Sequence, residues 1–113
     1  MEGFIFDNIN NGVYKVGFAA NQQHYDKALT ALFEALDEVE VLLSYNRYLL
    51  GDSLSAADII LFSTLVRFDS VYHPYMKCNK KRIQDYTNLW GYTRDIYQLP
   101  GVISTINLDS VKR

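Results

Sequence analysis

Residues 59–68 carry large apolar side chains on almost every side that a helix would present. A helix with 3.6 residues per turn and no polar face is stable only where other helices surround it. We therefore expect this segment to be the central helix of a bundle, and nothing elsewhere in the chain indicates a strand. The sequence predicts an all-α fold in which this segment buries Ile59, Ile60, Leu61, Phe62, Leu65, Val66 and Phe68.

The start of this helix is marked by Ser55 and Asp58, which stand three residues apart just before the apolar run. In such a capping box each side chain bonds the backbone amide of the other residue, which satisfies two amides that a helix start leaves unpaired. Leu54 and Ile59 occupy the positions of a hydrophobic staple. We interpret Ser55 as a cap and not as a nucleophile, because no histidine stands in a plausible triad with it, and Asp58 as structural.

A second segment, residues 21–46, has apolar residues at three- and four-residue steps and begins with a plausible N-cap, Asn21. Its acidic residues fall mostly on the opposite face, at Glu34, Asp37, Glu38 and Glu40. We expect a solvated face and not a metal site, because no histidine or cysteine converges on these carboxylates. His24 and His73 lack companions at ligand spacing, so the sequence predicts no metal site anywhere.

The remaining segments predict shorter helices. Residues 2–11 are typical of the end of a helix, and the Asn-Asn-Gly sequence at 10–12 favours a helix end or a turn. Because no linker, repeat or low-complexity stretch interrupts the chain, we expect residues 1–113 to form a single domain. The last third predicts further helices near residues 79–85, 87–98 and 100–106, the last two separated by a Pro-Gly pair.

The composition argues against several classes of function. The formal net charge is −2 over 113 residues, so nothing marks the surface for nucleic acid or for an anionic membrane. No apolar run approaches the roughly 20 residues that span a bilayer, and the first residues lack the features of a secretory signal. The single cysteine cannot form an internal disulfide, which favours a cytoplasmic location.

That cysteine, Cys78, stands in a basic run formed by Lys77, Lys80, Lys81 and Arg82. Neighbouring cations lower the pKa of a thiol and raise its reactivity. We nevertheless favour a half-buried structural cysteine, and we interpret the basic run as a solvated helix start and not as a nucleic-acid site. Arg67 and Asp69 stand two residues apart, so they do not face each other on a helix and each is expected to pair elsewhere.

Several longer motifs resemble one family. The segment GDSLSAADIILFSTLVRFD, residues 51–69, is similar to the buried helix of the C-terminal domain of glutathione transferases. Further motifs in order along almost the whole chain resemble the Xi class of these enzymes, the glutathionyl-hydroquinone reductases. They are INNGVYKVGFA at 9–19, TLVRFDSVY at 64–72, KCNKKRI at 77–83 and NLWGYTRDIYQLPGV at 88–102.

The resemblance implies a helical bundle of the glutathione transferase C-terminal type. It also implies that an N-terminal thioredoxin-like domain, which in the family binds glutathione and carries a Cys-Pro-Trp cysteine, is missing from this chain, since the chain has no Cys-Pro pair. A second active-site tyrosine of the family lies just after the segment that matches INLDSVKR. The family forms a homodimer that uses glutathione to act on a small aromatic quinol, and we expect the chain alone to be inactive.

Tyr14 matches the tyrosine of the family's G-V-Y-K motif, which implies a place in the substrate cleft as a hydrogen-bond or proton donor. Without the resemblance, Tyr14 would be interpreted as a tyrosine at the edge of the core. The nearby Gly12 and Gly17 are expected to let backbone and ligand approach closely. Further aromatic residues either line the substrate side of the cleft or belong to the core, namely Tyr72, Tyr75 and Trp90.

Two other functions remain open at this point. The helical domain could have been kept as a binding or assembly module with no catalytic role. It could also belong to another cysteine-type transferase class with thiol-transferase activity. The motifs NNGVYK and NLWGYTRDIY argue against that second alternative.

Overall fold

Residues 1–99 are the part of the chain that the computed structural model describes. In these residues no strand occurs apart from an isolated bridge between Tyr48 and Gly51, which confirms the all-α prediction. The short helix predicted near 100–106 lies outside them. In chain order the elements are α1 (Glu2–Ile5), the π-helical turn η1 (Phe6–Asn10), α2 (Asn11–Gly17), α3 (Gln22–Tyr45), α4 (Ala56–Arg67), the π-helical turn η2 (Phe68–Tyr72), the 3₁₀ turn η3 (Ile83–Asp85) and α5 (Thr87–Tyr97).

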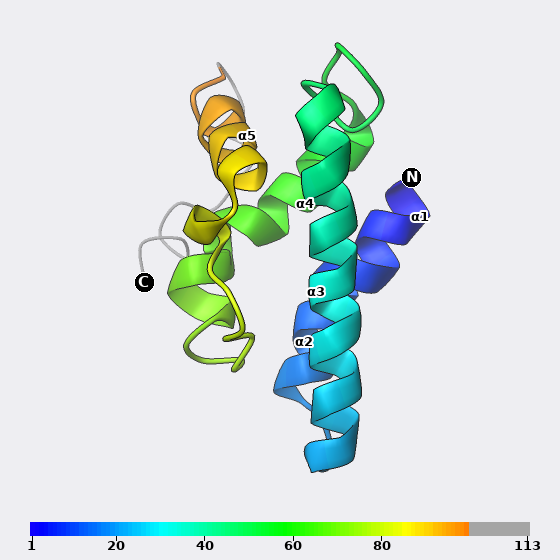
Figure 1. The fold of residues 1–113 in the computed structure, drawn as a ribbon, viewed down its shortest axis with the longest axis vertical. Helices are drawn as coiled ribbons and strands as arrows, with labels where there is room; N and C mark the ends of the chain where they lie inside the picture. The colour runs from blue at the N-terminus through cyan, green and yellow to red at the C-terminus, as the bar shows by residue number, and fades with distance from the viewer. Residues whose placement is uncertain (100–113) are drawn as a thin grey trace.

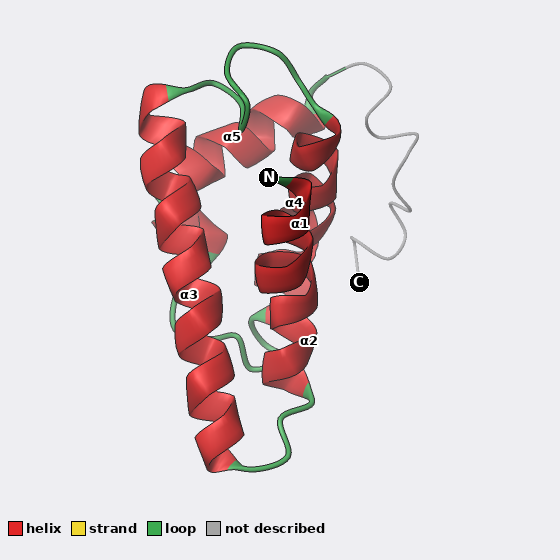
Figure 2. Ribbon diagram, turned by 90° about the vertical axis from the view of Figure 1, so that its right-hand side faces the viewer, coloured by secondary structure: helices red, strands yellow, loops and turns green. Residues whose placement is uncertain are grey.

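The long helix α3 runs the length of the bundle, with the α1–η1–α2 run alongside it (Figure 1). Figure 2 shows these two parts side by side, joined by a loop at one end. The predicted N-cap of α3 is confirmed, because the side chain of Asn21 accepts a hydrogen bond of 2.9 Å from the amide of His24. The apolar face of α3 is buried at Leu32, Phe33, Ala35, Leu36, Val39 and Leu43.

The break predicted at residues 10–12 is wrong, because α1, η1 and α2 form one continuous helical run. Asparagine disfavours a helix interior when its side chain bonds nearby backbone groups. Here Nδ2 of Asn10 instead donates to the carbonyl oxygen of Ile60 on α4, at 2.9 Å. A Cβ at Gly12 would lie 3.2 Å from Cδ1 of Leu32, so the missing side chain lets α2 pack closely on α3.

The helix α4 occupies the central position that its apolar sequence predicts, in contact with the α1–η1 run and with α5. The capping box is present at its start, where the Asp58 carboxylate accepts from the Ser55 amide at 2.9 Å and from the Ser55 hydroxyl at 2.7 Å. Asp58 is fully buried and also accepts from the Leu49 amide at 2.9 Å and the Tyr92 hydroxyl at 2.7 Å. One carboxylate therefore joins the loop before α4, the start of α4, and α5.

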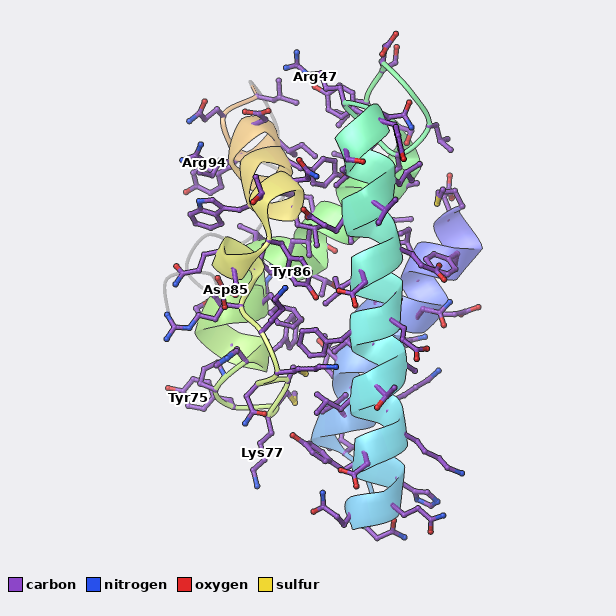
Figure 3. All side chains as sticks on the ribbon, viewed as in Figure 1. Arg47, Tyr75, Lys77, Asp85, Tyr86 and Arg94 are labelled. Carbon is purple, nitrogen blue, oxygen red and sulfur yellow. The ribbon has the colours of Figure 1, made fainter. Side chains whose placement is uncertain are left out.

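The N-terminus of α5 is held by α3. The two carboxylate oxygens of Glu40 accept from the amides of Asn88 and Leu89 at 2.9 and 2.8 Å. Asp37 accepts from the hydroxyl of Tyr86 at 2.8 Å, and Figure 3 shows Tyr86 between the η3–α5 segment and α3. The prediction of a merely solvated acidic face is therefore wrong for these two carboxylates. The first amides of a helix lack intrahelical partners, and they attract negative charge from a neighbouring element.

The helix predicted near residues 79–85 is wrong, since only the single turn η3 forms there. Residues 79–82 before this turn are exposed and not helical, and in residues 77–82 only Cys78 is buried. Asp69 on η2 accepts from the amides of Ile83 and Gln84, at 2.6 and 3.2 Å, and so caps the turn. Arg67 donates to a carbonyl of its own helix, so this residue and Asp69 each pair elsewhere, as expected.

We predict that Asp58→Asn lowers the free energy of unfolding by about 3 kcal/mol, because an amide nitrogen cannot accept the hydrogen bonds that the lost oxygen accepted. The measurement is the urea midpoint of the purified chain, followed by circular dichroism. Asp52→Asn is the matched control, because Asp52 is exposed in the same loop region, and its effect should stay below about 0.5 kcal/mol. Equal midpoints for the two variants would contradict the role given to Asp58.

We also predict that Glu40→Ala costs about 1 kcal/mol, because two amides at the start of α5 lose a charged acceptor. Glu34→Ala is the control, since Glu34 is exposed on the same helix and the change in helix propensity is identical. Urea unfolding of both variants decides the matter. If Glu40 were only solvated, the two variants would unfold at the same urea concentration.

Candidate functional site

A cleft of about 340 Å³ opens between the η1–α2 run and the α4–η2 run. Its walls combine aromatic rings with hydroxyl and amide groups, and among the described residues that line it the only charged side chain is Arg67. We call it the Tyr14 cleft. Such a lining suits a hydroxylated aromatic ligand better than a purely apolar one. It is formed by Phe6, Asn10, Asn11, Tyr14, Ser63, Thr64, Arg67 and Tyr72.

The centre of the cleft is a pair of phenols. The hydroxyl oxygens of Tyr14 and Tyr72 form a hydrogen bond of 3.2 Å, and their rings meet edge to face with centroids 5.7 Å apart. Tyr14 is 44% exposed, so its phenol is open to a ligand, whereas Tyr72 is buried. Burial and then the hydrogen bond to Tyr14 raise the pKa of Tyr72, and the charge of Arg67 lowers it in part. Tyr72 therefore keeps its proton at neutral pH and has a hydrogen to donate.

Each wall of the cleft contains a π-helical turn. In η2 the amide of His73 donates to the carbonyl of Phe68, five residues earlier, at 2.8 Å. Such turns insert one extra residue into a helix, change the direction of the side chains that follow, and occur often at functional sites. Tyr72 belongs to η2 and Asn10 to η1, so each turn contributes a side chain to the lining.

Of the lining residues, sequence reasoning assigned only Tyr14 and Tyr72 to this cleft, and Asn10 and Arg67 are two that it did not assign. Oδ1 of Asn10 is buried without a hydrogen-bond partner, the one such side-chain atom found among residues 1–99. Arg67 is half-buried at the end of α4, where it lines the cleft. The available signal was a cation inside the apolar run LVRF, since a charge in a central helix needs a partner or a use.

The structure does not bring Trp90 or Tyr75 into the Tyr14 cleft. Trp90 is 38% exposed and lines a different hollow of about 450 Å³, where the Arg94 guanidinium lies 5.8 Å from the centre of its ring. Tyr75 is 74% exposed and lines a third hollow near Lys77. Figure 3 shows the side chain of Tyr75 pointing away from α3. Of the four tyrosine and tryptophan candidates, the cleft therefore unites Tyr14 and Tyr72 alone.

The two glycines beside Tyr14 serve packing and not ligand approach in this cleft. Gly12 is buried against Leu32, and a Cβ at Gly17 would press on the side chain of Met76. Neither glycine lines the Tyr14 cleft. The expectation that they admit a ligand there is wrong, because Gly12 is buried against α3 and Gly17, although exposed, lines the separate hollow that contains Tyr75.

Cys78 is fully buried, and burial raises its pKa to about 12. Its thiol lies 3.7 Å from the carbonyl oxygen of Val13. The lysines and arginine beside it in sequence do not lower its pKa, because desolvation dominates. The structural interpretation holds, although the residue is wholly buried and not half-buried. Cys78 cannot act as a thiolate nucleophile in the folded protein at neutral pH.

No group of three or more histidine, cysteine, aspartate or glutamate side chains in residues 1–99 is arranged to hold a metal ion. In the same residues no helix is both long enough and apolar enough to cross a bilayer.

Comparison with known proteins places this arrangement in a family. Residues 22–95, which include α3, α4 and most of α5, match the family described as glutathione S-transferase, C-terminal domain. The chain belongs to this family. The match covers more than half of the sequence, and it includes the capping box and the central helix on which the resemblance to glutathione transferases was based.

Individual relatives of this glutathione S-transferase domain agree with that result. The chain is 52% identical over 112 residues to the glutathionyl-hydroquinone reductase YqjG of Escherichia coli, covering 99% of this chain and 34% of that protein. It is 45% identical to the glutathionyl-hydroquinone reductase PcpF of Sphingobium chlorophenolicum, covering 96% of this chain and 34% of the relative. The chain therefore spans about a third of the length of these curated relatives.

Solved glutathione S-transferase structures confirm the resemblance to the Xi class. A glutathione-bound structure of YqjG from Escherichia coli K-12 superposes with a TM-score of 0.92 at 53% identity, over 97% of this chain and 36% of that one. A Xi-class glutathione transferase from Natrialba magadii superposes with a TM-score of 0.90 at 48% identity, over 95% of this chain and 33% of that one.

We predict that Ellman's reagent does not modify Cys78 in the folded chain at pH 8, because the pKa of the thiol lies near 12. In concentrated urea at the same pH the thiol is exposed and reacts. Val41→Cys provides the control, since Val41 is 57% exposed on α3 and the new thiol should react in the folded chain. Prompt reaction of the folded wild-type chain would contradict the burial described here.

Proposed function

We propose that the chain is the C-terminal helical domain of a glutathione-dependent reductase of glutathionyl-hydroquinones. In this proposal the Tyr14 cleft is the substrate-side wall of the active site. The observation that carries it is the open phenol of Tyr14, paired with Tyr72 in a polar aromatic cleft. Support comes from the 52% identity to a glutathionyl-hydroquinone reductase of Escherichia coli.

The reaction needs a thiolate that the described residues do not supply, because Cys78 is buried and its pKa is raised to about 12. We assign the thiolate to a thioredoxin-like domain that works together with this chain. The thiolate attacks the glutathionyl sulfur, so that a sulfur–sulfur bond forms and the bond from sulfur to the ring carbon breaks. The ring carbon keeps the electron pair and takes a proton. The thiolate of a second glutathione then attacks the glutathionyl sulfur of this mixed disulfide, so that glutathione disulfide forms and the cysteine leaves as a thiolate.

The role of this chain is to direct hydrogen bonds at the quinol. Tyr72 keeps its proton, and when it donates to the oxygen of Tyr14 the hydrogen of Tyr14 is free to point into the cleft. A phenol placed in this way donates a hydrogen bond or a proton to the substrate as charge develops on the ring. Glutathione is the co-substrate of the whole enzyme, and we do not expect this chain alone to bind it tightly.

We further propose that the enzyme is a cytoplasmic homodimer. Large apolar side chains are exposed near the end of α3 and in the loop that follows, at Val41, Tyr45, Leu50 and Leu54, and they provide a surface for contact with a second copy. The relevant measurement is the sedimentation mass of the whole enzyme. A monomer at micromolar concentration would contradict the proposal.

A chimera tests the function directly. The region of the Escherichia coli reductase that matches this chain is replaced by residues 1–113, and turnover of a glutathionyl-hydroquinone is measured. We expect the chimera to be active and the Tyr14→Phe variant to have a kcat about a hundredfold lower, because the donor in the cleft is lost. The 113-residue chain alone should show no turnover.

Tyr75→Phe in the same chimera is the matched control, since Tyr75 loses the same hydroxyl in a different hollow. Its kcat should equal that of the unmodified chimera. An unchanged kcat in a folded Tyr14→Phe chimera would contradict the role given to Tyr14. Robust turnover by the chain alone would contradict the assignment of the reactive thiolate to a thioredoxin-like domain.

A further inference from the structure

Arg67 is a cation in a cleft whose other lining residues are uncharged. It ends α4 and is half-buried, which is costly for a charge unless a partner or ligand compensates. One of its nitrogens donates to the carbonyl of Ser63, which holds the guanidinium against its own helix. A guanidinium has five N–H groups, so most of its donors remain for other partners.

The nearest carboxylate in sequence does not neutralise Arg67. Asp69 is engaged by the amides of Ile83 and Gln84 on the far side of η2. The charge of Arg67 acts instead on the phenol of Tyr72, whose pKa it lowers against the larger effect of burial. The positive charge of Arg67 therefore acts on the part of the cleft where the hydroxyls of Tyr14 and Tyr72 form their hydrogen bond.

These observations describe a small hollow bounded by aromatic rings, where a hydrogen-bonded pair of phenols has one hydroxyl hydrogen left for a ligand and a guanidinium supplies a positive charge. A neutral ring hydroxyl would use only the phenols. An ionised ring oxygen would accept from the free phenol hydrogen and from the guanidinium together, and hydrogen bonds with a charged partner are roughly twice as strong as neutral ones.

We propose that Arg67 is a binding residue for the ionised oxygen of a phenol, so that the Tyr14 cleft selects aromatic ligands as phenolates. The proposal rests on the proposed function, and it names the form of the quinol that the cleft receives. In the reductase step, negative charge on the ring oxygen pushes electron density toward the ring carbon that takes the proton. Arg67 holds that oxygen in place, and no further oxidant or reductant is required.

The test is the binding of 4-nitrophenol to the 113-residue chain, followed by NMR at a pH where this probe is ionised. The methyl ether 4-nitroanisole has the same ring and cannot ionise. We expect the wild-type chain to bind the phenolate about tenfold more tightly than the ether. In Arg67→Gln this preference should disappear, while Arg67→Lys, which keeps the charge, should retain part of it; circular dichroism of both variants checks that the fold is unchanged.

Arg94→Gln is the matched control, because Arg94 lines the separate Trp90 hollow and its loss should leave the preference unchanged. S-methylglutathione serves as a carboxylate probe for the other source of an anionic oxygen. If its binding depends on Arg67 and phenolate binding does not, the phenolate assignment is overturned. The same follows if the wild-type chain binds neither small probe or binds both equally.

These outcomes are independent of the proposed function. An active chimera together with no phenolate preference would remove the role of Arg67 and leave the reductase assignment standing. An inactive chimera together with an Arg67-dependent preference would contradict the reductase assignment and support the phenolate site at Arg67.

Discussion

The buried carboxylate of Asp58 is the interaction on which the arrangement of this domain depends. It accepts four hydrogen bonds, from the loop before α4, from the start of α4 and from the hydroxyl of Tyr92 on α5. A buried carboxylate without such partners is strongly unfavourable, so the three segments cannot separate without exposing or stranding a charge. Of α3, α4 and α5, the most hydrophobic helix is thus positioned by a polar group at its first turn.

The position of α4 in turn determines the geometry of the cleft. Its far end carries Arg67 and continues into the π-helical turn that presents Tyr72. The opposite wall is attached to the same helix through the amide of Asn10, which bonds the carbonyl of Ile60. Both walls are therefore fastened to α4, and the phenols of Tyr14 and Tyr72 meet although they stand 58 residues apart in sequence.

The described residues supply hydrogen-bond donors and a cation, but they supply no reactive thiolate. The cleft offers hydroxyl donors and a guanidinium, all suited to an aromatic oxygen, whereas the one thiol of the chain is sealed in the core with its pKa raised to about 12. Desolvation outweighs the nearby cations at Cys78 because a buried charge loses its hydration, while exposed lysines and arginine are screened by water. A thiol-bearing domain that places a reactive sulfur at the open side of Tyr14 would supply the nucleophile that the described residues lack.

By itself the sequence determined the features that depend on neighbours along the chain. The N-cap at Asn21, the capping box at Ser55 and Asp58, and the burial of the apolar helix follow from which amides lack partners and which faces lack polar groups. The family motif around Tyr14 belongs with them, since it can be read as a short string of residues.

Only the tertiary structure decided where the polar groups of distant segments meet. Asn10 remains inside a helix because its amide finds α4, Glu40 caps α5 across 48 and 49 residues, and Arg67 faces phenols and not a carboxylate. Trp90 and Tyr14 resemble each other as candidates in the sequence, yet they line separate hollows. The physical reason is that hydrogen-bond and charge partners are chosen by distance in space, which local periodicity and helix capping do not encode.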